Sequence, residues 1–232
     1  MNCPHSNVEA ALDRWSECHW HIHQMEANYH DPDLFRYSLN SFIRAVKEIP
    51  QILKMELQNH ESFKTIFKPL IDEMKSNELL GLLSKKRDFV VHQGMLNVLS
   101  AGSVGTTEGR GIKISMGFKV APYESTIEAY ERFKELCKKD STIRGIAGPD
   151  CDSWPMIRRE WKIEEFKEKE LLEVAIEAWQ LSGQVISNIV IALGAEPLDL
   201  SFSCRHDPEK VKTMEFSQEE FFLSVDGIQI NA

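Results

Sequence analysis

The sequence predicts a mainly α-helical protein, an up-and-down helical bundle with a small strand-containing insertion. Apolar residues recur at three- and four-residue spacing over four long stretches, which is the period of an amphipathic helix. Residues 112–120 instead alternate apolar and polar side chains, as a half-buried β-strand does. A length of 232 residues favours a single domain, 1–232, with an elaboration.

Turn and capping residues set the expected limits of the bundle helices. Asp33 follows an Asp-Pro break and can cap the second helix. Pro50 is expected to kink that helix. Ser76 or Asn77 offers a cap for the next one, and Gly194 ends the last. The expected bundle helices cover residues 7–30, 33–58, 76–99 and 163–193.

Residues 100–160 form the expected insertion. Its glycine-rich start, residues 100–111, breaks the helical pattern. The strand at 112–120 needs a partner, either the chain around Val104 or a stretch near the C-terminus. A helix over 125–139 and a loop over 145–155 complete the insertion. The predicted organisation is therefore a bundle core of 7–99 plus 163–193, the insertion, and an irregular tail over 195–232.

Composition narrows the functional classes. The net charge of -9 argues against a large nucleic-acid-binding surface, because phosphate contacts require Lys and Arg. The charge is uneven: residues 1–100 carry 11 basic and 13 acidic residues, and residues 101–232 carry 16 and 23. No apolar run approaches the ~18 residues of a membrane span, and no secretory signal opens the sequence. Five scattered cysteines indicate free thiols in a reducing compartment. We expect a cytoplasmic protein.

The segment SKKRDFVVHQG, residues 84–94, places three polar side chains in an apolar helical run. Asp88 and His92 are four positions apart and share a helix face. A neighbouring aspartate fixes the tautomer of a histidine and raises its pKa, and the Arg87 guanidinium can bind a phosphate. These groups suffice for metal-free RNA cleavage, with His92 transferring a proton and Arg87 neutralising phosphate charge. The alternative is a solvated helix face with a weak surface pair.

The hexapeptide RDFVVH, residues 87–92, resembles the Arg-polar-x-x-x-His signature of the HEPN superfamily. The upstream piece YHDPDLFRYSLNSFIRAV, residues 29–46, is similar to a HEPN helix pair. The likeness covers residues 7–99, with the long helix expected at 163–193 as a further candidate stretch, and it does not explain the insertion or the C-terminal tail. It implies an all-helical, dimeric protein, in many members a metal-independent endoribonuclease of toxin–antitoxin or anti-phage defence systems. By resemblance, Arg87 and His92 are the catalytic pair and Asp88 supports them.

Four further residues are candidates for substrate binding. Lys85 and Lys86 form a basic cluster with Arg87. Arg36 and Asn40 lie four apart on the helix expected to face this cluster. They either contribute to a polar pocket around Arg87 or form a surface hydrogen bond.

The segment CHWHIH, residues 18–23, is the densest group of metal-binding side chains. His19 and His23 are four apart, but His19 lies on the apolar side of its helix, as a core histidine does. Cys204 and His206 stand isolated from them in the sequence. We therefore expect no metal and no cofactor. A metal-binding bundle stays an alternative if both histidines point to a site with a further cysteine or carboxylate.

The leading hypothesis is a metal-independent endoribonuclease of the HEPN type. The alternative is a non-catalytic helical module for dimerisation or protein binding. The expected partners are RNA, a second copy of the chain, and an antitoxin or other protein; no membrane is expected. The two hypotheses differ in whether Arg87 and His92 are accessible and converge in a groove, and the enzyme hypothesis fails if carboxylates of its own chain cap each arginine.

Overall fold

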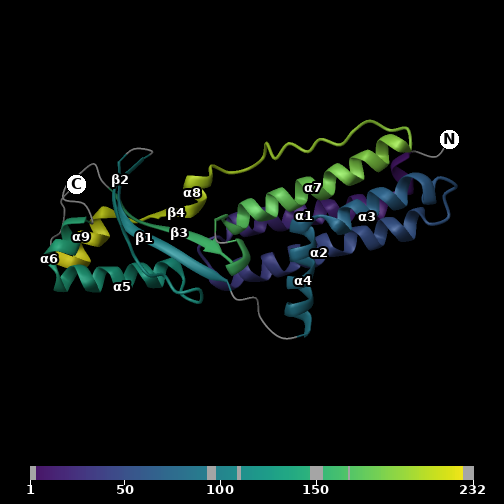
Figure 1. Ribbon diagram of the computed structural model, residues 1–232. Helices are drawn as coiled ribbons and strands as arrows, with labels where there is room; N and C mark the ends of the chain where they lie inside the picture. Colours follow the sequence, from purple (N-terminus) through teal and green to yellow (C-terminus); the bar gives the residue numbers. More distant parts are fainter. Residues whose placement is uncertain (1–3, 93–97, 109–110, 147–153, 167, 227–232) are drawn as a thin grey trace. The chain divides into compact units, whose positions relative to one another are not determined.

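The computed structural model describes residues 4–92, 98–108, 111–146, 154–166 and 168–226 (Figure 1). The chain divides into two compact units. We call residues 1–26, 36–97 and 172–205 the helical unit, and residues 27–35, 98–171 and 206–232 the sheet unit. Each unit is described by itself. Helices dominate the described chain and the strands form one small antiparallel sheet, which confirms the mainly α prediction.

Long helices build the helical unit, and α1 runs antiparallel to α2. The Glu56 carboxylate accepts a hydrogen bond from the backbone N–H of Ala10 (2.8 Å), and Arg14 lies 3.5 Å from Glu48. The indole of Trp15 stacks on that of Trp179 with ring centroids 4.5 Å apart, which joins α1 to α7. In Figure 1, α4 lies across α2. The elements are α1 (Glu9–Ala27), α2 (Pro32–Leu57), a π-helical turn (Phe63–Phe67), α3 (Lys68–Ser76), α4 (Glu78–His92) and α7 (Leu171–Ala192).

The helix limits confirm some predicted caps and correct one. Asn77 Oδ1 accepts from the N–H of Leu80 (3.2 Å) and caps α4, as predicted. Asp31 caps α2, because its Oδ1 accepts from the N–H groups of Asp33 (3.0 Å) and Leu34 (2.9 Å). The prediction of Asp33 as the cap is therefore wrong. Pro32 occupies the first helical position, where the missing N–H costs nothing.

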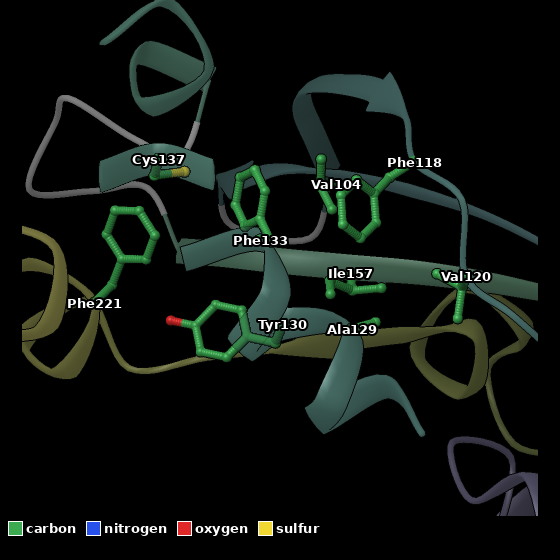
Figure 2. Packing of buried hydrophobic residues seen from close by; sticks show 9 residues of the cluster. All are labelled: Val104, Phe118, Val120, Ala129, Tyr130, Phe133, Cys137, Ile157 and Phe221. Atoms are coloured by element: carbon green, nitrogen blue, oxygen red, sulfur yellow. The ribbon is translucent and has the colours of Figure 1, made fainter. Parts of the chain in front are cut away.

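The sheet unit contains a four-stranded antiparallel sheet in the order β2-β1-β3-β4. The strands are β1 (Leu99–Glu108), β2 (Gly111–Gly117), β3 (Trp154–Lys162) and β4 (Thr213–Glu215). The helices are α5 (Thr126–Lys139), α6 (Ser141–Ile146), α8 (Pro208–Lys212) and α9 (Gln218–Asp226). Figure 2 shows the core that strands, α5 and α9 share. Its members are Val104, Phe118, Val120, Ala129, Tyr130, Phe133, Cys137, Ile157 and Phe221.

Strand β1 corrects the expectation of a glycine-rich break at 100–111. A side chain at Gly105 would bring Cβ within 1.9 Å of the carbonyl oxygen of Ile114. Glycine at that position therefore permits close pairing with β2 and does not end the structure. Val104 lies opposite Met116, so the predicted partner around Val104 is confirmed.

Three other expectations change. The helix expected at 76–99 ends at His92, and β1 begins at Leu99. The helix expected at 163–193 begins at Leu171, after strand β3 and a 3-10 turn over Glu164–Phe166. The tail expected to be irregular contains α8, β4 and α9.

A buried arginine organises the sheet unit beside the core. The Arg159 guanidinium donates to the carbonyl oxygens of Ala121 (3.0 Å) and Glu124 (2.7 Å) and to Ser100 Oγ (3.0 Å). It lies 3.6 Å from the ring centroid of Trp161. Burial lowers the pKa of Arg159 to about 10. The hydrogen bonds of Arg159 on β3 thus tie this strand to Ser100 on β1 and to the segment that precedes α5. The carbonyl oxygens and the aromatic ring stabilise the buried guanidinium.

Candidate functional site

Arg87 and Asp88 lie side by side on α4. The Arg87 side chain is 27 % exposed, and its Nη1 donates to Asp88 Oδ1 at 3.3 Å. Its Nε is buried without a hydrogen-bond partner in the described part of the chain. The guanidinium is thus partly capped by a carboxylate of its own chain.

Asp88 also bonds across helices. Lys47 of α2 donates to the same Oδ1, and the Asp88 side chain is 52 % exposed. The hydrogen bond from Lys47, and then the contact with Arg87, lower the pKa of the Asp88 carboxyl. Asp88 therefore acts as an anion between two cations.

The other predicted site residues are less tightly grouped. His92 is the last residue of α4, and its side chain lies outside the described part of the structure. Lys85 is exposed and Lys86 is partly buried on α4. The Arg36 guanidinium lies 5.7 Å from the ring centroid of Tyr37. Asn40 Oδ1 is buried without a partner among the described residues, so it accepts no hydrogen bond from Arg87.

A groove of about 300 Å³ opens where α2, α3 and α4 meet, and Lys47, the partner of Asp88, is among its lining residues. Its apolar lining comes from Val46, Pro50, Met74 and Leu80. Three lysines, Lys47, Lys75 and Lys85, also line it. The sequence showed Lys85 as a candidate, but Lys47 and Lys75 were missed because they are far from the motif in the chain.

A second group of reactive side chains lies elsewhere in the helical unit. His19 Nε2 is 3.1 Å and His23 Nε2 is 3.3 Å from Cys204 Sγ. The expectation that Cys204 is isolated from this histidine pair is therefore wrong. His23 Nδ1 lies 2.8 Å from Glu26 Oε2, and the Glu26 side chain is fully buried. Burial, and then the neighbouring His23, lower the pKa of His19.

A family model described as bacteriophage lambda protein ea47 matches residues 1–210. The chain belongs to the bacteriophage lambda protein ea47 family. No curated protein and no solved structure matches it.

Membership of the ea47 family corrects the HEPN resemblance. The match spans 1–210 and therefore includes both stretches on which that resemblance depended, 29–46 and 87–92. The Arg-polar-x-x-x-His signature specifies only three positions. An amphipathic helix with charged residues on one face can therefore match this pattern by chance. The HEPN assignment is thus wrong, and the family gives no support to the dimer or to the catalytic pair that the resemblance implied.

The helices give no sign of a bilayer-spanning segment. Among the described residues, none is both long and apolar enough to cross a membrane. The long helix α7 carries polar positions such as Ser182, Ser187 and Asn188.

Proposed function

We propose that this ea47-family protein is a non-catalytic helical module that binds an acidic segment of a partner protein. The groove between α2, α3 and α4 carries the proposal, since it combines apolar lining with three lysines. An amphipathic acidic peptide matches both features: its apolar side chains fill the groove and its carboxylates meet the lysines.

The apolar lining of the groove favours a peptide over RNA. RNA affinity depends on a broad surface of cations, and the chain carries a net charge of -9. A groove of about 300 Å³ with an apolar lining suits a few anchoring side chains instead.

The state of Arg87 agrees with a binding role. Asp88 caps the guanidinium and also accepts from Lys47. A carboxylate in this position competes with a phosphate for Arg87. Substrate phosphate would first have to displace Asp88, which disfavours charge stabilisation at a reacting centre.

Metal-independent RNA cleavage by Arg87 and His92 is the second candidate. One observation favours it: Arg87 Nε is buried and lacks a partner among the described residues, and a phosphate oxygen would satisfy this donor. This candidate requires Asp88 to release the guanidinium when RNA binds.

Fluorescence anisotropy with two probes tests the proposal. One probe is a labelled peptide that alternates Glu or Asp with Leu, and the other is a single-stranded RNA of equal charge. We expect the peptide to bind more tightly than the RNA. Lys75→Glu and Lys85→Glu should each weaken peptide binding by about tenfold, equivalent to ~1.4 kcal/mol. Lys54→Glu is the matched control, because Lys54 is exposed on α2 and does not line the groove.

Two results would reject the binding proposal. One is equal peptide affinity for wild type, Lys75→Glu and Lys85→Glu. The other is RNA cleavage that persists with EDTA and disappears in both Arg87→Ala and His92→Ala, which would establish the second candidate instead.

A further inference from the structure

Two imidazoles and a thiol converge on one point of the helical unit, and none of them lines the groove. His19 and His23 are one helical turn apart on α1. Both Nε2 atoms face Cys204 Sγ, at 3.1 and 3.3 Å. The three ligand atoms lie within 4.8 Å of one another. A cation held between them would accept a lone pair from each of the three atoms.

We propose that His19, His23 and Cys204 bind one divalent transition-metal ion of the zinc class. Imidazole nitrogen and thiolate sulfur are the donors that such ions prefer. In tetrahedral coordination with the usual Zn–N and Zn–S lengths, nitrogen and sulfur ligands lie about 3.6 Å apart. The observed separations are a few tenths of an ångström shorter, so a modest shift of the sulfur admits the ion. Three protein ligands leave a further position for water or an exogenous ligand.

The carboxylate of Glu26 orients His23 for this role. Glu26 Oε2 lies 2.8 Å from His23 Nδ1, so the imidazole donates Nδ1–H to it and leaves the Nε2 lone pair toward the sulfur. Glu26 Oε1 is buried without a hydrogen-bond partner among the described residues. A buried carboxylate with so few donors is stabilised by a cation bound next to it.

The polypeptide that carries Cys204 is fixed against α7. In Figure 1 it runs back along that helix. The N–H of Leu198 donates to Ser187 Oγ (3.0 Å), and Gln180 Nε2 donates to the carbonyl oxygen of Leu200 (3.2 Å). Beyond the cysteine, the Arg205 guanidinium binds both oxygens of Glu173. The thiol is therefore held in position from both sides.

Aromatic rings fix the histidines. Phe202 lies 4.9 Å from the ring centroid of His19 and 5.3 Å from that of His23. His19 also stacks on Trp179 at 5.2 Å. The ligand rings are thus oriented before an ion binds, which lowers the entropic cost of binding.

Titration of the purified full-length chain with Co²⁺, followed by competition with Zn²⁺, tests the proposal. We expect one ion per chain, a thiolate-to-cobalt charge-transfer band, and loss of that band when Zn²⁺ displaces Co²⁺. Cys204→Ser should abolish the band and weaken Zn²⁺ affinity at least ~100-fold. Glu26→Gln should retain the band and weaken Zn²⁺ affinity about 10- to 100-fold, as expected for a residue that orients a ligand.

Two controls match the ligands. His21→Gln removes a histidine of the same helix that contacts Glu17 instead (3.4 Å). Cys137→Ala removes a buried thiol of the sheet unit. Both should keep wild-type affinity, with circular dichroism verifying the fold of every variant. The proposal is overturned if no charge-transfer band forms, if Cys204→Ser keeps it, or if Cys204→Ser binds Zn²⁺ as tightly as wild type, which would indicate adventitious binding.

Discussion

Asp88 is the residue that balances charge beside the groove. Its carboxylate accepts from Lys47 on α2 and from Arg87 on α4. Asp88→Asn should release both cations and strengthen binding of the acidic peptide several-fold. Stability should change little, since exposed ion pairs contribute only ~0–1 kcal/mol. Anisotropy titrations of wild type and variant measure the effect.

Asp13→Asn is the control for Asp88→Asn, because it removes the same charge from α1. Its peptide affinity should match that of wild type. Weaker binding by Asp88→Asn would mean that the Lys47 and Arg87 contacts order the groove and do not merely neutralise it.

His30 makes the sheet unit sensitive to acid. Its Nδ1 lies 2.9 Å from Thr126 Oγ1. Burial, and then the charge of Arg159, lower the pKa of His30 from 6.5 to about 4. The folded state therefore keeps His30 neutral where the unfolded state protonates it. The contribution of neutral His30 to the free energy of unfolding is fully present above pH 6.5. It is lost as the pH falls to about 4, and the loss is at most ~3 kcal/mol.

Urea unfolding of wild type and His30→Gln at neutral pH and near pH 5 measures the His30 contribution. The free-energy difference between the two proteins should shrink at the lower pH. Comparison with the variant is needed because the pKa values of His19 and His21 are also lowered, so both histidines contribute to acid sensitivity with the same sign. A constant difference would show that His30 is not the titrating group.

Residue-level prediction grouped candidates that are close in sequence and missed partners that are distant. The predicted pairing of Asp88 with His92 stays a prediction, because the His92 side chain lies outside the described residues. The structure pairs Asp88 with its neighbour Arg87. Lys47, 41 residues before Asp88, carried no signal in the sequence. Cys204 was missed for the same reason, since 181 residues separate it from His23.

At the scale of elements, α7 depends on a glycine for its packing. A Cβ at Gly183 would lie 2.6 Å from Trp15 Cζ2 and 2.7 Å from Leu200 Cδ2. Gly183→Ala should lower the free energy of unfolding by about 1–2 kcal/mol, because overpacking outweighs the ~1 kcal/mol gain in helix propensity. Denaturant unfolding followed by tryptophan fluorescence measures the change.

Gly81→Ala is the matched control for Gly183→Ala. Gly81 lies within α4, and an added Cβ meets nothing within 4 Å. Helix propensity alone should then raise stability by about 0.5–1 kcal/mol. Changes of the same sign in both variants would contradict the packing argument for Gly183.

Helices were predicted correctly where apolar residues recur at a regular three- and four-residue spacing. The helices α1, α2 and α5 lie within a few residues of their predicted ranges. Strand β3 was missed because its central positions Arg158, Arg159 and Glu160 are charged. Arg159 is nevertheless buried, through hydrogen bonds to carbonyl groups that no local pattern reveals.

At the scale of the whole molecule, each compact unit is assembled from three separate stretches of chain. Residues 27–35, between two bundle helices in sequence, belong to the sheet unit. The N–H of Trp161 Nε1 donates to the carbonyl oxygen of Tyr29 (2.8 Å), which ties them there. Such interleaving depends on long-range contacts, so the sequence predicted the fold class but not this division.

The groove proposal also predicts how peptide binding depends on salt concentration. Ion pairs between a peptide and exposed lysines are screened by salt, with a Debye length of about 8 Å at physiological ionic strength. Affinity for the acidic peptide should therefore fall as salt rises, while contacts with the apolar lining of the groove preserve part of it.

The most direct test measures the affinity for the acidic peptide at low and at physiological salt. It compares wild type with the double variant that carries Lys75→Glu and Lys85→Glu. We predict that wild type binds more tightly at low salt and that the double variant binds weakly at both, with little salt dependence. Salt-independent affinity that is equal in the two proteins would contradict the proposal that the lysine-lined groove binds an acidic partner.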